Sequence, residues 1–513
     1  MTAISAHSSG AAPVAPAGDT SGSLARDALA VLQPGFTGTT APDWVLRRLE
    51  EGLGSVALFS RNIETPEQVA ALTARLRQVR PDVLVAADEE GGDVTRIESR
   101  GGSSFPGNLA LGAVDDVELT RAVAAELGRR LAGCGVNLDW APSADVNSDP
   151  GNPVIGVRSF GADPALVARN TAAYVAGLQS AGVAASVKHF PGHGDTATDS
   201  HLALPRVDVD LDTLRSRELV PFRAALEAGA KVVMSAHILV PALDPDLPAT
   251  LSRAALTGLL RAPAPAGGLG FDGLIVTDGI EMRAISDTYG IRRGTVMALA
   301  AGADAICVGG GLSDEDTVLA LRDAIVAAVR DGSLPAERLA DAAARVRALA
   351  AWAAERSGAA EELAPDPGVG LEAARRAVRV TRGPGFTPLS SPPYVAAFTP
   401  VANIAVGDVT PWGVAAELER LLPGTETGTY RSQDVTGLLA AAGPRPVVAV
   451  VRDMHRHPWM ASAVAALLAA RPDTVVVEMG VPQAPPAGAL HVATHGAARV
   501  CGEAAAEAIV SAR

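Results

Sequence analysis

Residues 83–90 have the sequence VLVAADEE, in which a short apolar run leads directly into three carboxylates. Residues 274–278, LIVTD, repeat this pattern with a single carboxylate at the end. Short runs of small and β-branched apolar residues are typical of parallel strands that are buried on both faces. The two stretches therefore predict buried strands with polar residues at their carboxyl ends.

Six further apolar runs of similar length lie before, between and after these two. They are residues 30–36, 55–59, 136–140, 184–187, 231–235 and 303–308. Amphipathic helical patterns separate the runs, for example residues 66–79, with Thr65 as N-cap and Pro66 at the first helical position. Eight strand–helix units predict an α/β fold, a (β/α)8 barrel of the TIM type. An open dinucleotide-binding sheet is disfavoured because its glycine pattern is missing after the first strands.

The chain is expected to divide into four parts. Residues 1–24, rich in Ala, Ser, Gly and Pro, are predicted to be a flexible tail. Residues 25–356 hold the barrel, and residues 357–370 have the Gly, Pro and acidic composition of a linker. Residues 371–513 carry a second set of strand and helix patterns, which predicts a smaller C-terminal α/β sandwich domain.

Composition and charge exclude several classes of partner. The 513 residues carry a net charge of −14, which disfavours nucleic acid and anionic membrane surfaces. The three cysteines are scattered and form neither a disulfide framework nor a zinc motif. The N-terminus lacks the pattern of a Sec-type signal peptide, and no apolar stretch reaches the roughly 18 residues of a membrane span. We expect a cytoplasmic location, and the sequence does not determine the oligomeric state.

Polar residues follow most of the predicted strands within a few positions. They are Arg61 and Asn62, Asp88 to Glu90, Asp145, Lys188 and His189, His237, and Asp278. The carboxyl ends of barrel strands open on one face, where TIM-barrel enzymes carry their active sites. We therefore expect these side chains to converge. Asp278, which ends its strand directly, suits either a nucleophile or a helix N-cap.

Residues 188–201 contain three histidines, two aspartates and a lysine. As metal ligands, the histidines at 189, 193 and 201 with Asp195 or Asp199 would suit zinc. As an acid–base pair, Asp199 would favour the protonated imidazole of His201, which could then donate a proton near neutral pH. Metal-dependent barrels usually add an H-x-H pair after an early strand, and here that pattern occurs only at residues 455–457. The acid–base interpretation is therefore favoured.

Four segments together resemble glycoside hydrolase family 3, and more narrowly its β-N-acetylhexosaminidase branch. They are residues 88–92 (DEEGG), residues 158–161 (RSFG), residues 188–194 (KHFPGHG) with 199–201 (DSH), and residues 277–278 (TD). The resemblance implies a retaining mechanism in which Asp278 attacks the anomeric carbon. It also implies that His201, paired with Asp199, protonates the leaving oxygen and then activates the incoming nucleophile.

The resemblance implies a set of sugar-binding residues as well. They are Asp88, Arg96, Arg158, Lys188, His189 and His237. The expected substrate is a small glycan with a terminal β-linked N-acetylglucosamine, such as a muropeptide from peptidoglycan turnover. No cofactor and no metal are expected, and the C-terminal domain is assigned no catalytic residue.

Other functions remain open on the sequence alone. A β-N-acetylglucosaminide phosphorylase would use the same site, since a histidine acid–base repels phosphate less than a carboxylate does. A β-glucosidase of the same fold, or an enzyme with both specificities, is a second alternative. A zinc-dependent barrel hydrolase and a non-catalytic sugar-binding protein complete the set.

Overall fold

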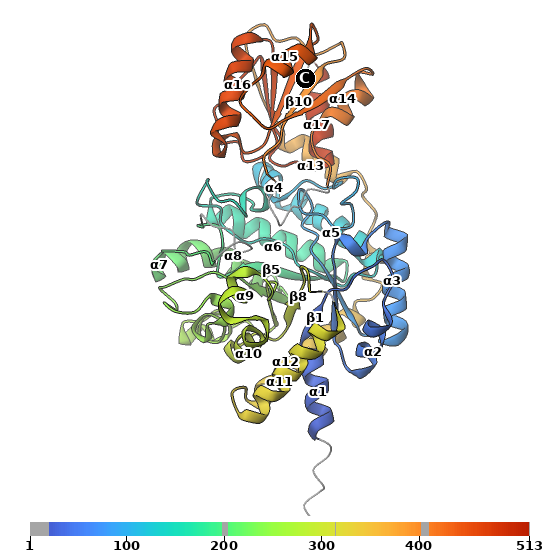
Figure 1. Ribbon diagram of the computed structural model, residues 1–513, viewed down its shortest axis with the longest axis vertical. Helices are drawn as coiled ribbons and strands as arrows, with labels where there is room; N and C mark the ends of the chain where they lie inside the picture. Colours follow the sequence, from blue (N-terminus) through green and yellow to red (C-terminus); the bar gives the residue numbers. More distant parts are fainter. Residues whose placement is uncertain (1–19, 197–203, 313, 402–409, 512–513) are drawn as a thin grey trace, which may run out of the picture.

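The structure, a computed structural model, describes residues 20–196, 204–312, 314–401 and 410–511. A larger N-terminal unit contains two parallel sheets, and a smaller C-terminal unit with its own sheet stands on one end of it (Figure 1). Helix α1 extends from the opposite end of the molecule (Figure 1). No helix in the described ranges has the length and apolar character needed to cross a lipid bilayer.

All eight strands predicted for the N-terminal unit are present and parallel. They are β1 (Leu32–Pro34), β2 (Ser55–Leu58), β3 (Leu84–Ala87), β4 (Leu138–Asp139), β5 (Ala184–Phe190), β6 (Val232–Ser235), β7 (Leu274–Thr277) and β8 (Ile306–Val308). Strands β2 to β7 form one sheet in sequence order, and β1 pairs with β8 in a second sheet.

The two sheets approach each other at both ends. A parallel bridge joins Val276 of β7 to Ala305, next to β8. On the other side, Ser55 Oγ of β2 donates to the carbonyl oxygen of Leu32 at 3.2 Å. The α/β class is therefore confirmed, with a parallel six-stranded half-barrel and a separate strand pair. The predicted single closed ladder of eight strands is not fully formed among the described residues.

Helices follow most strands and cover the outside of the sheets. They are α1 (Thr20–Ala30), α2 (Asp43–Glu51), α3 (Pro66–Val79), α4 (Asn108–Val114), α5 (Val117–Gly133), α6 (Pro164–Ser180), α7 (Leu211–Thr213), α8 (Leu219–Glu227), α9 (Arg283–Tyr289), α10 (Ile291–Ala301), α11 (Glu315–Asp331) and α12 (Ala336–Glu355). The predicted cap of α3 is confirmed, because the Thr65 side chain accepts from the backbone N–H of Gln68 at 3.2 Å.

The C-terminal unit is a six-stranded sheet between helices. Its elements are α13 (Val369–Ala377), β9 (Arg379–Arg382), β10 (Tyr394–Phe398), α14 (Ala415–Leu421), β11 (Glu426–Tyr430), α15 (Thr436–Ala442), β12 (Val447–Val451), α16 (Pro458–Ala470), β13 (Val475–Glu478), β14 (Leu490–Ala493) and α17 (Arg499–Val510). The strand order is β11-β10-β12-β13-β14-β9, and only β9 is antiparallel to its neighbour. One buried cluster holds residues of α13, α14 and α17, and another holds residues of α15 and α16, so helices cover both faces.

Helices extend into both the predicted tail and the predicted linker. Helix α1 begins at Thr20, inside the range expected to be a flexible tail, and ends with Ala28 and Leu29 buried in the main core. Within the expected linker, a short 3-10 helix, η7 (Ala359–Glu362), forms and α13 begins at Val369. The linker is held against α5, where the backbone N–H of Asp366 donates to Glu126 at 3.2 Å.

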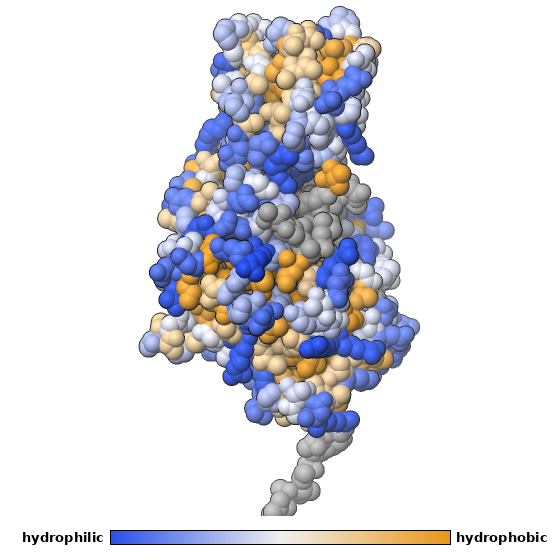
Figure 2. Space-filling model, turned by 60° about the vertical axis from the view of Figure 1, so that its left-hand side comes forward, coloured by the Kyte–Doolittle hydropathy of each residue, from blue (hydrophilic) through white to orange (hydrophobic). Residues whose placement is uncertain are grey.

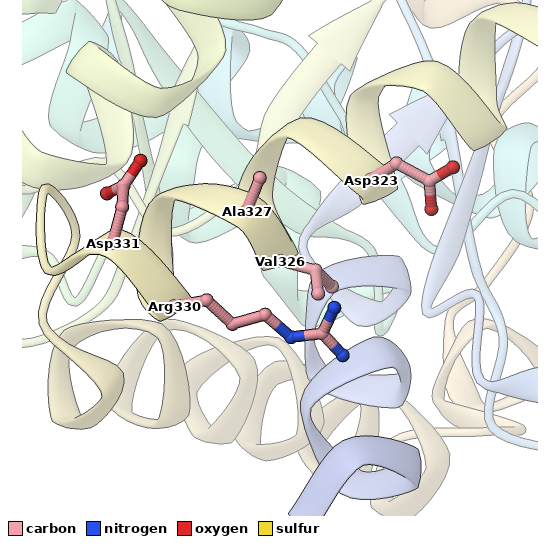
Figure 3. Close-up of a pocket in the computed structure, with 5 residues that line it drawn as sticks. All are labelled: Asp323, Val326, Ala327, Arg330 and Asp331. Atoms are coloured by element: carbon pink, nitrogen blue, oxygen red, sulfur yellow. The ribbon is translucent and has the colours of Figure 1, made fainter.

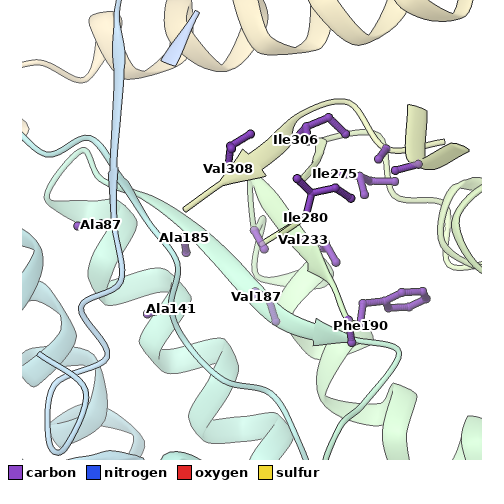
Figure 4. Close-up of a cluster of buried hydrophobic side chains, with 14 of the residues drawn as sticks. Ala87, Ala141, Ala185, Val187, Phe190, Val233, Ile275, Ile280, Ile306 and Val308 are labelled. Carbon is purple, nitrogen blue, oxygen red and sulfur yellow. The ribbon is translucent and has the colours of Figure 1, made fainter. Parts of the chain in front are cut away.

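Two apolar layers lie on opposite faces of the parallel strands. Ile275 of β7 packs with Val187, Val233 and other residues beneath the outer helices (Figure 4). Its neighbour Val276 belongs to a separate cluster with Met234. This alternation is the period of two that a strand imposes on its side chains. Because both faces are filled by apolar groups, the strand carboxyl ends are left for polar side chains.

Candidate active site

Lys188, near the end of β5, is the centre of a buried charge network. Its side chain is 2% exposed. The ammonium group donates to Asp88 Oδ1 and lies 2.6 Å from Glu90 Oε1, and both carboxylates follow β3. Burial by itself lowers the pKa of Lys188, but the charges of Asp88 and Glu90 outweigh burial and raise it. The lysine is therefore held as a cation between two carboxylates.

Asp88 also contacts Arg96, from the same loop. Arg96 Nη2 donates to Asp88 Oδ2 at 2.9 Å. Burial raises the pKa of Asp88, while the charges of Lys188, Arg96 and Arg158 lower it, and the net effect lies well below the usual value. Asp88 therefore remains a carboxylate at any ordinary pH, able to accept hydrogen bonds from hydroxyl groups of a ligand.

Arg158, from the short helix η2 (Gly156–Arg158), extends the network toward His189. Its guanidinium donates to both oxygens of Glu90, at 2.6 Å from Nη2 to Oε1 and 3.0 Å from Nε to Oε2. Arg158 Nη2 also lies 3.4 Å from His189 Nε2. On its other side, His189 Nδ1 lies 2.7 Å from Oδ2 of the fully buried Asp145. The carboxylate fixes the ring orientation of His189 and directs Nε2 toward the arginine.

The segment after His189 is braced by its own side chains. His193 Nδ1 lies 2.8 Å from Thr196 Oγ1, and its backbone N–H donates to Asp145 at 2.7 Å. Burial lowers the pKa of His193 to about 4, so the ring is neutral at pH 7. Asp199 and His201, predicted to be the acid–base pair, lie outside the described residues.

Asp278 stands directly after β7. Its backbone N–H donates to Ser235 of β6 at 3.1 Å, and the N–H of Gly279 donates to Asp278 Oδ1 at 2.7 Å. Asp278 lies at the same edge of the sheet as the end of β5, because Ser235 of β6 pairs with Thr277 on one side and with Phe190 on the other. Burial and then the charges of Glu281, Asp278 and Asp88 raise the pKa of Cys307, which lies in the buried layer below. The ends of β3 and β5 thus bring Asp88 and Lys188 into contact, and Asp278 ends a strand at the same edge of the sheet.

His237, predicted to bind the sugar, contacts the protein through both ring nitrogens. Nδ1 lies 2.9 Å from Thr250 Oγ1, and Nε2 lies 2.9 Å from the carbonyl oxygen of Gly279. The ring is fully buried. In this arrangement His237 supports the peptide that follows Asp278.

Three carboxylates of the site carried no assigned role in the sequence-based prediction. Glu90 and Asp145 orient the arginine and histidine of the network, and both were visible only as polar residues after strands. Glu281 accepts from the backbone N–H of Gly309 at 3.1 Å, and burial raises its pKa. Their roles depend on partners far along the chain, and no spacing rule identifies such partners.

The structure shows only part of the predicted metal-ligand set, because Asp199 and His201 lie outside the described ranges. These ranges contain no group of three or more His, Cys, Asp and Glu side chains arranged to hold a metal ion. A surface pocket lined by Asp323, Val326, Ala327, Arg330 and Asp331 lies on the outer helix α11 (Figure 3). None of the predicted site residues lines it, so the network at the strand ends remains the candidate site.

The network suits recognition of a polyhydroxylated ligand, because fixed carboxylates and cations alternate around it. Charged acceptors and donors form stronger hydrogen bonds to hydroxyl groups than neutral ones do. The sequence of this chain matches the N-terminal domain of glycosyl hydrolase family 3 over residues 40–349. The chain belongs to glycoside hydrolase family 3.

Relatives of this family 3 hydrolase carry a consistent name. This chain is 37% identical to the β-hexosaminidase of Pseudomonas aeruginosa over 278 residues, which are 53% of this chain and 80% of that protein. It is 38% identical to β-hexosaminidase A of Pseudoalteromonas piscicida over 274 residues, 49% of this chain and 45% of that protein. These matches confirm the predicted resemblance to the β-N-acetylhexosaminidase branch.

Solved structures extend the similarity to the C-terminal unit of the family 3 hydrolase. A family 3 β-N-acetylglucosaminidase from Paenibacillus sp. str. FPU-7 superposes with a TM-score of 0.83 and 35% identity, over 95% of this chain and 96% of that one. A β-glucoside phosphorylase at 19% identity, with a TM-score of 0.74, shares the fold. Both units therefore recur together in relatives of known structure.

Proposed function

We propose that this family 3 hydrolase is an exo-acting, retaining β-N-acetylglucosaminidase. In this proposal Asp278 is the nucleophile and the pair of His201 and Asp199 is the general acid and base. The observation that carries the proposal is the position of Asp278 directly after β7, at the sheet edge where β5 also ends. The names of the relatives support the sugar specificity.

The reaction then has two displacement steps. Asp278 attacks the anomeric carbon, the bond to the leaving oxygen breaks, and that oxygen takes a proton from His201. Water next attacks the glycosyl–aspartate ester and gives its proton to His201, which releases N-acetylglucosamine and regenerates the Asp278 carboxylate. Asp199 would stabilise the imidazolium form of His201, which gives up its proton in the first step and is restored in the second.

The ion network supports the binding side of the proposal. Asp88, Lys188, Arg158 and His189 are oriented by one another before any ligand binds, which reduces the conformational entropy lost on binding. Arg96, from the same loop, donates to Asp88 and helps to keep its carboxylate charged. The eight strands would act as one closed (β/α)8 barrel that holds these groups in register. Peptidoglycan fragments as substrates and a cytoplasmic location stay predictions.

The test is release of p-nitrophenol from its β-N-acetylglucosaminide by the wild type and by Asp278→Ala. We expect turnover in the wild type and a loss of about a thousandfold or more in the variant. His201→Ala should impair substrates with poor leaving groups far more than p-nitrophenyl substrates, because only the former need protonation. Equal losses on both would contradict the acid role.

Three parallel measurements decide the alternatives. Faster turnover in phosphate, with formation of the sugar 1-phosphate, would identify a phosphorylase. Equal turnover of the p-nitrophenyl β-glucoside would identify an enzyme with both specificities. Loss of activity after thorough chelation would favour the zinc hydrolase. A wild type that turns over neither glycoside would overturn the proposed function.

A further inference from the structure

Asp93, in the loop after β3, is held by the C-terminal unit. Its side chain is 2% exposed. Arg452, 359 residues further along the chain, donates from Nη2 to Asp93 Oδ2. The backbone N–H of Ala497 donates to Asp93 Oδ1 at 2.7 Å. Both oxygens of a carboxylate in the N-terminal unit are therefore bound by the other unit.

Arg452 is itself fixed in position. It follows β12 directly, and its guanidinium lies 5.8 Å from the centre of the Trp412 ring. Its side chain is 15% exposed. Hydrophilic residues gather where the C-terminal unit meets the rest of the molecule, as Figure 2 shows for one face. A cation between an aromatic face and a buried carboxylate has little freedom to move.

The loop between Asp93 and the candidate site is stiff. Gly91 and Val94 form an antiparallel bridge, and the backbone N–H of Glu90 donates to the carbonyl oxygen of Val94 at 3.0 Å. Gly92 is packed so closely against Gly107 that an added Cβ would lie 2.4 Å from its Cα. Asp93 is therefore linked to Glu90 by a tightly packed turn, and Asp88 lies two residues before Glu90.

Glu89 binds backbone N–H groups of the same loop. Its Oε2 accepts from the backbone N–H groups of Arg96 and Ile97, at 2.7 and 2.8 Å. Arg96 in turn reaches Asp88. Hydrogen bonds thus join the two arms of residues 88–97, with the charge network where the arms meet and Asp93 in the turn between them.

We propose that Arg452 is a positioning residue for substrate binding. It holds Asp93, and thereby sets the place of Asp88 and Glu90 relative to Lys188 and Arg158. The C-terminal unit then increases the affinity for the sugar without contacting the reacting atoms. This inference rests on the proposed function, because Asp88 is taken there as a sugar-binding group.

The test compares Arg452→Ala with Arg452→Lys and with a matched control. Arg376→Ala is the control, because Arg376 of α13 also joins the two units through Asp116 at 2.8 Å, away from the loop. Kinetics with the p-nitrophenyl N-acetylglucosaminide should show a KM raised roughly tenfold in Arg452→Ala, with kcat changed less than about threefold. Arg452→Lys should recover part of the affinity, and Arg376→Ala should match the wild type.

A second readout needs no substrate. Amide hydrogen exchange in peptides covering residues 88–107 should accelerate in Arg452→Ala and stay unchanged in Arg376→Ala. In Asp93→Ala, which also removes the hydrogen bond from Ala497, the exchange should rise at least as much as in Arg452→Ala. The double variant should add little to Asp93→Ala, because the pair with Arg452 is already lost.

The outcomes separate this inference from the proposed function. Unchanged exchange in Arg452→Ala, or an equal rise in Arg376→Ala, would overturn the role of Arg452 whatever the activity. A folded Arg452→Ala with wild-type KM, or with kcat reduced as strongly as kcat/KM, would overturn it too. If the wild type were inert on both glycosides, the proposed function would fail, and exchange alone would then decide whether Arg452 positions the loop.

Discussion

At the scale of single residues, the site depends on charges that are buried together. Burying an isolated charge costs several kcal/mol, so Lys188 is stable in its place only because Asp88 and Glu90 lie against it. The same holds for Arg158, whose guanidinium is paired with Glu90. Each group of the network therefore depends on the others for its charge and its position.

Replacing Lys188 by methionine should disturb the whole network. The variant keeps most of the length of the side chain but leaves two neighbouring carboxylates without their shared cation, so the pKa of Asp88 should rise. We expect kcat/KM to fall roughly 10- to 100-fold, with its acid limb moved to higher pH. Steady-state kinetics from pH 4 to 8 would measure both effects.

The chain offers a matched control for this change. Lys231 precedes β6, at the amino end of the strand, with its ammonium 5.6 Å from the centre of the Trp352 ring. Lys231→Met should keep the wild-type profile. An unshifted acid limb in Lys188→Met, measured on folded protein, would exclude the role given to the lysine.

At the scale of elements, one buried aspartate ties four segments together at the amino ends of the strands. Asp304, just before β8, accepts from the backbone N–H of Ile275 in β7 at 2.8 Å. It also accepts from Arg261, in the helical segment η5 (Ala254–Arg261), and from Arg338 of α12. This carboxylate fixes helix positions around the sheet on the side remote from the candidate site.

Asp304→Ala should destabilise the N-terminal unit without affecting chemistry. Two arginines and a strand N–H would lose their buried partner, which costs about 3–5 kcal/mol for a broken buried pair. Chemical denaturation would measure the loss, and kcat of the remaining folded enzyme should stay at the wild-type value. A loss below about 1 kcal/mol would mean that water replaces the carboxylate at little cost.

At the scale of the whole molecule, buried carboxyl groups link stability to pH. Burial raises the pKa of Glu89, Glu218 and Glu478 from 4.5 to about 7. A group with a raised pKa stabilises the fold fully below pH 4.5, and this contribution is lost as the pH rises to about 7. The lowered pKa values of Asp88 and Asp145 act in the opposite direction, and their contribution is lost as the pH falls below about 4.

Glu218→Gln should isolate one of these contributions. Glu218 Oε1 accepts from Arg217 at 2.6 Å, and Oε2 has no hydrogen-bond partner in the part of the chain that the structure describes, so an amide fits the site. Between pH 4.5 and 7, ionisation of Glu218 lowers the unfolding free energy of the wild type. This contribution, about 1–3 kcal/mol, should be absent from the variant. Chemical denaturation of both proteins across this pH range would measure the difference in unfolding free energy.

The exposed Glu372 on α13 supplies the control for the pH series. Glu372→Gln should follow the wild type at every pH. Parallel curves for Glu218→Gln and the wild type would show that Glu218 titrates alike in the folded and unfolded chain.

Local pattern determined where the elements lie and which residues end the strands. Apolar runs of strand length specified all eight strands of the N-terminal unit, and the Thr65 cap specified the start of α3. The rule that parallel strands share one edge then predicted that Asp88, Lys188 and Asp278 would converge. The strands and the cap depend on hydrogen bonds and side-chain periods within a few residues, so the sequence carries them directly. The contact between Asp88 and Lys188 spans 100 residues and forms only when β3 and β5 share a sheet.

Only the tertiary structure decided which charges meet. Glu90 pairs with Arg158 at a distance of 68 residues along the chain, and Asp93 pairs with Arg452 across 359 residues. Such pairs leave no period or spacing in the sequence, because they form only after two elements pack. For the same reason, the composition of the N-terminal segment does not reveal that Ala28 and Leu29 of α1 are buried in the main core.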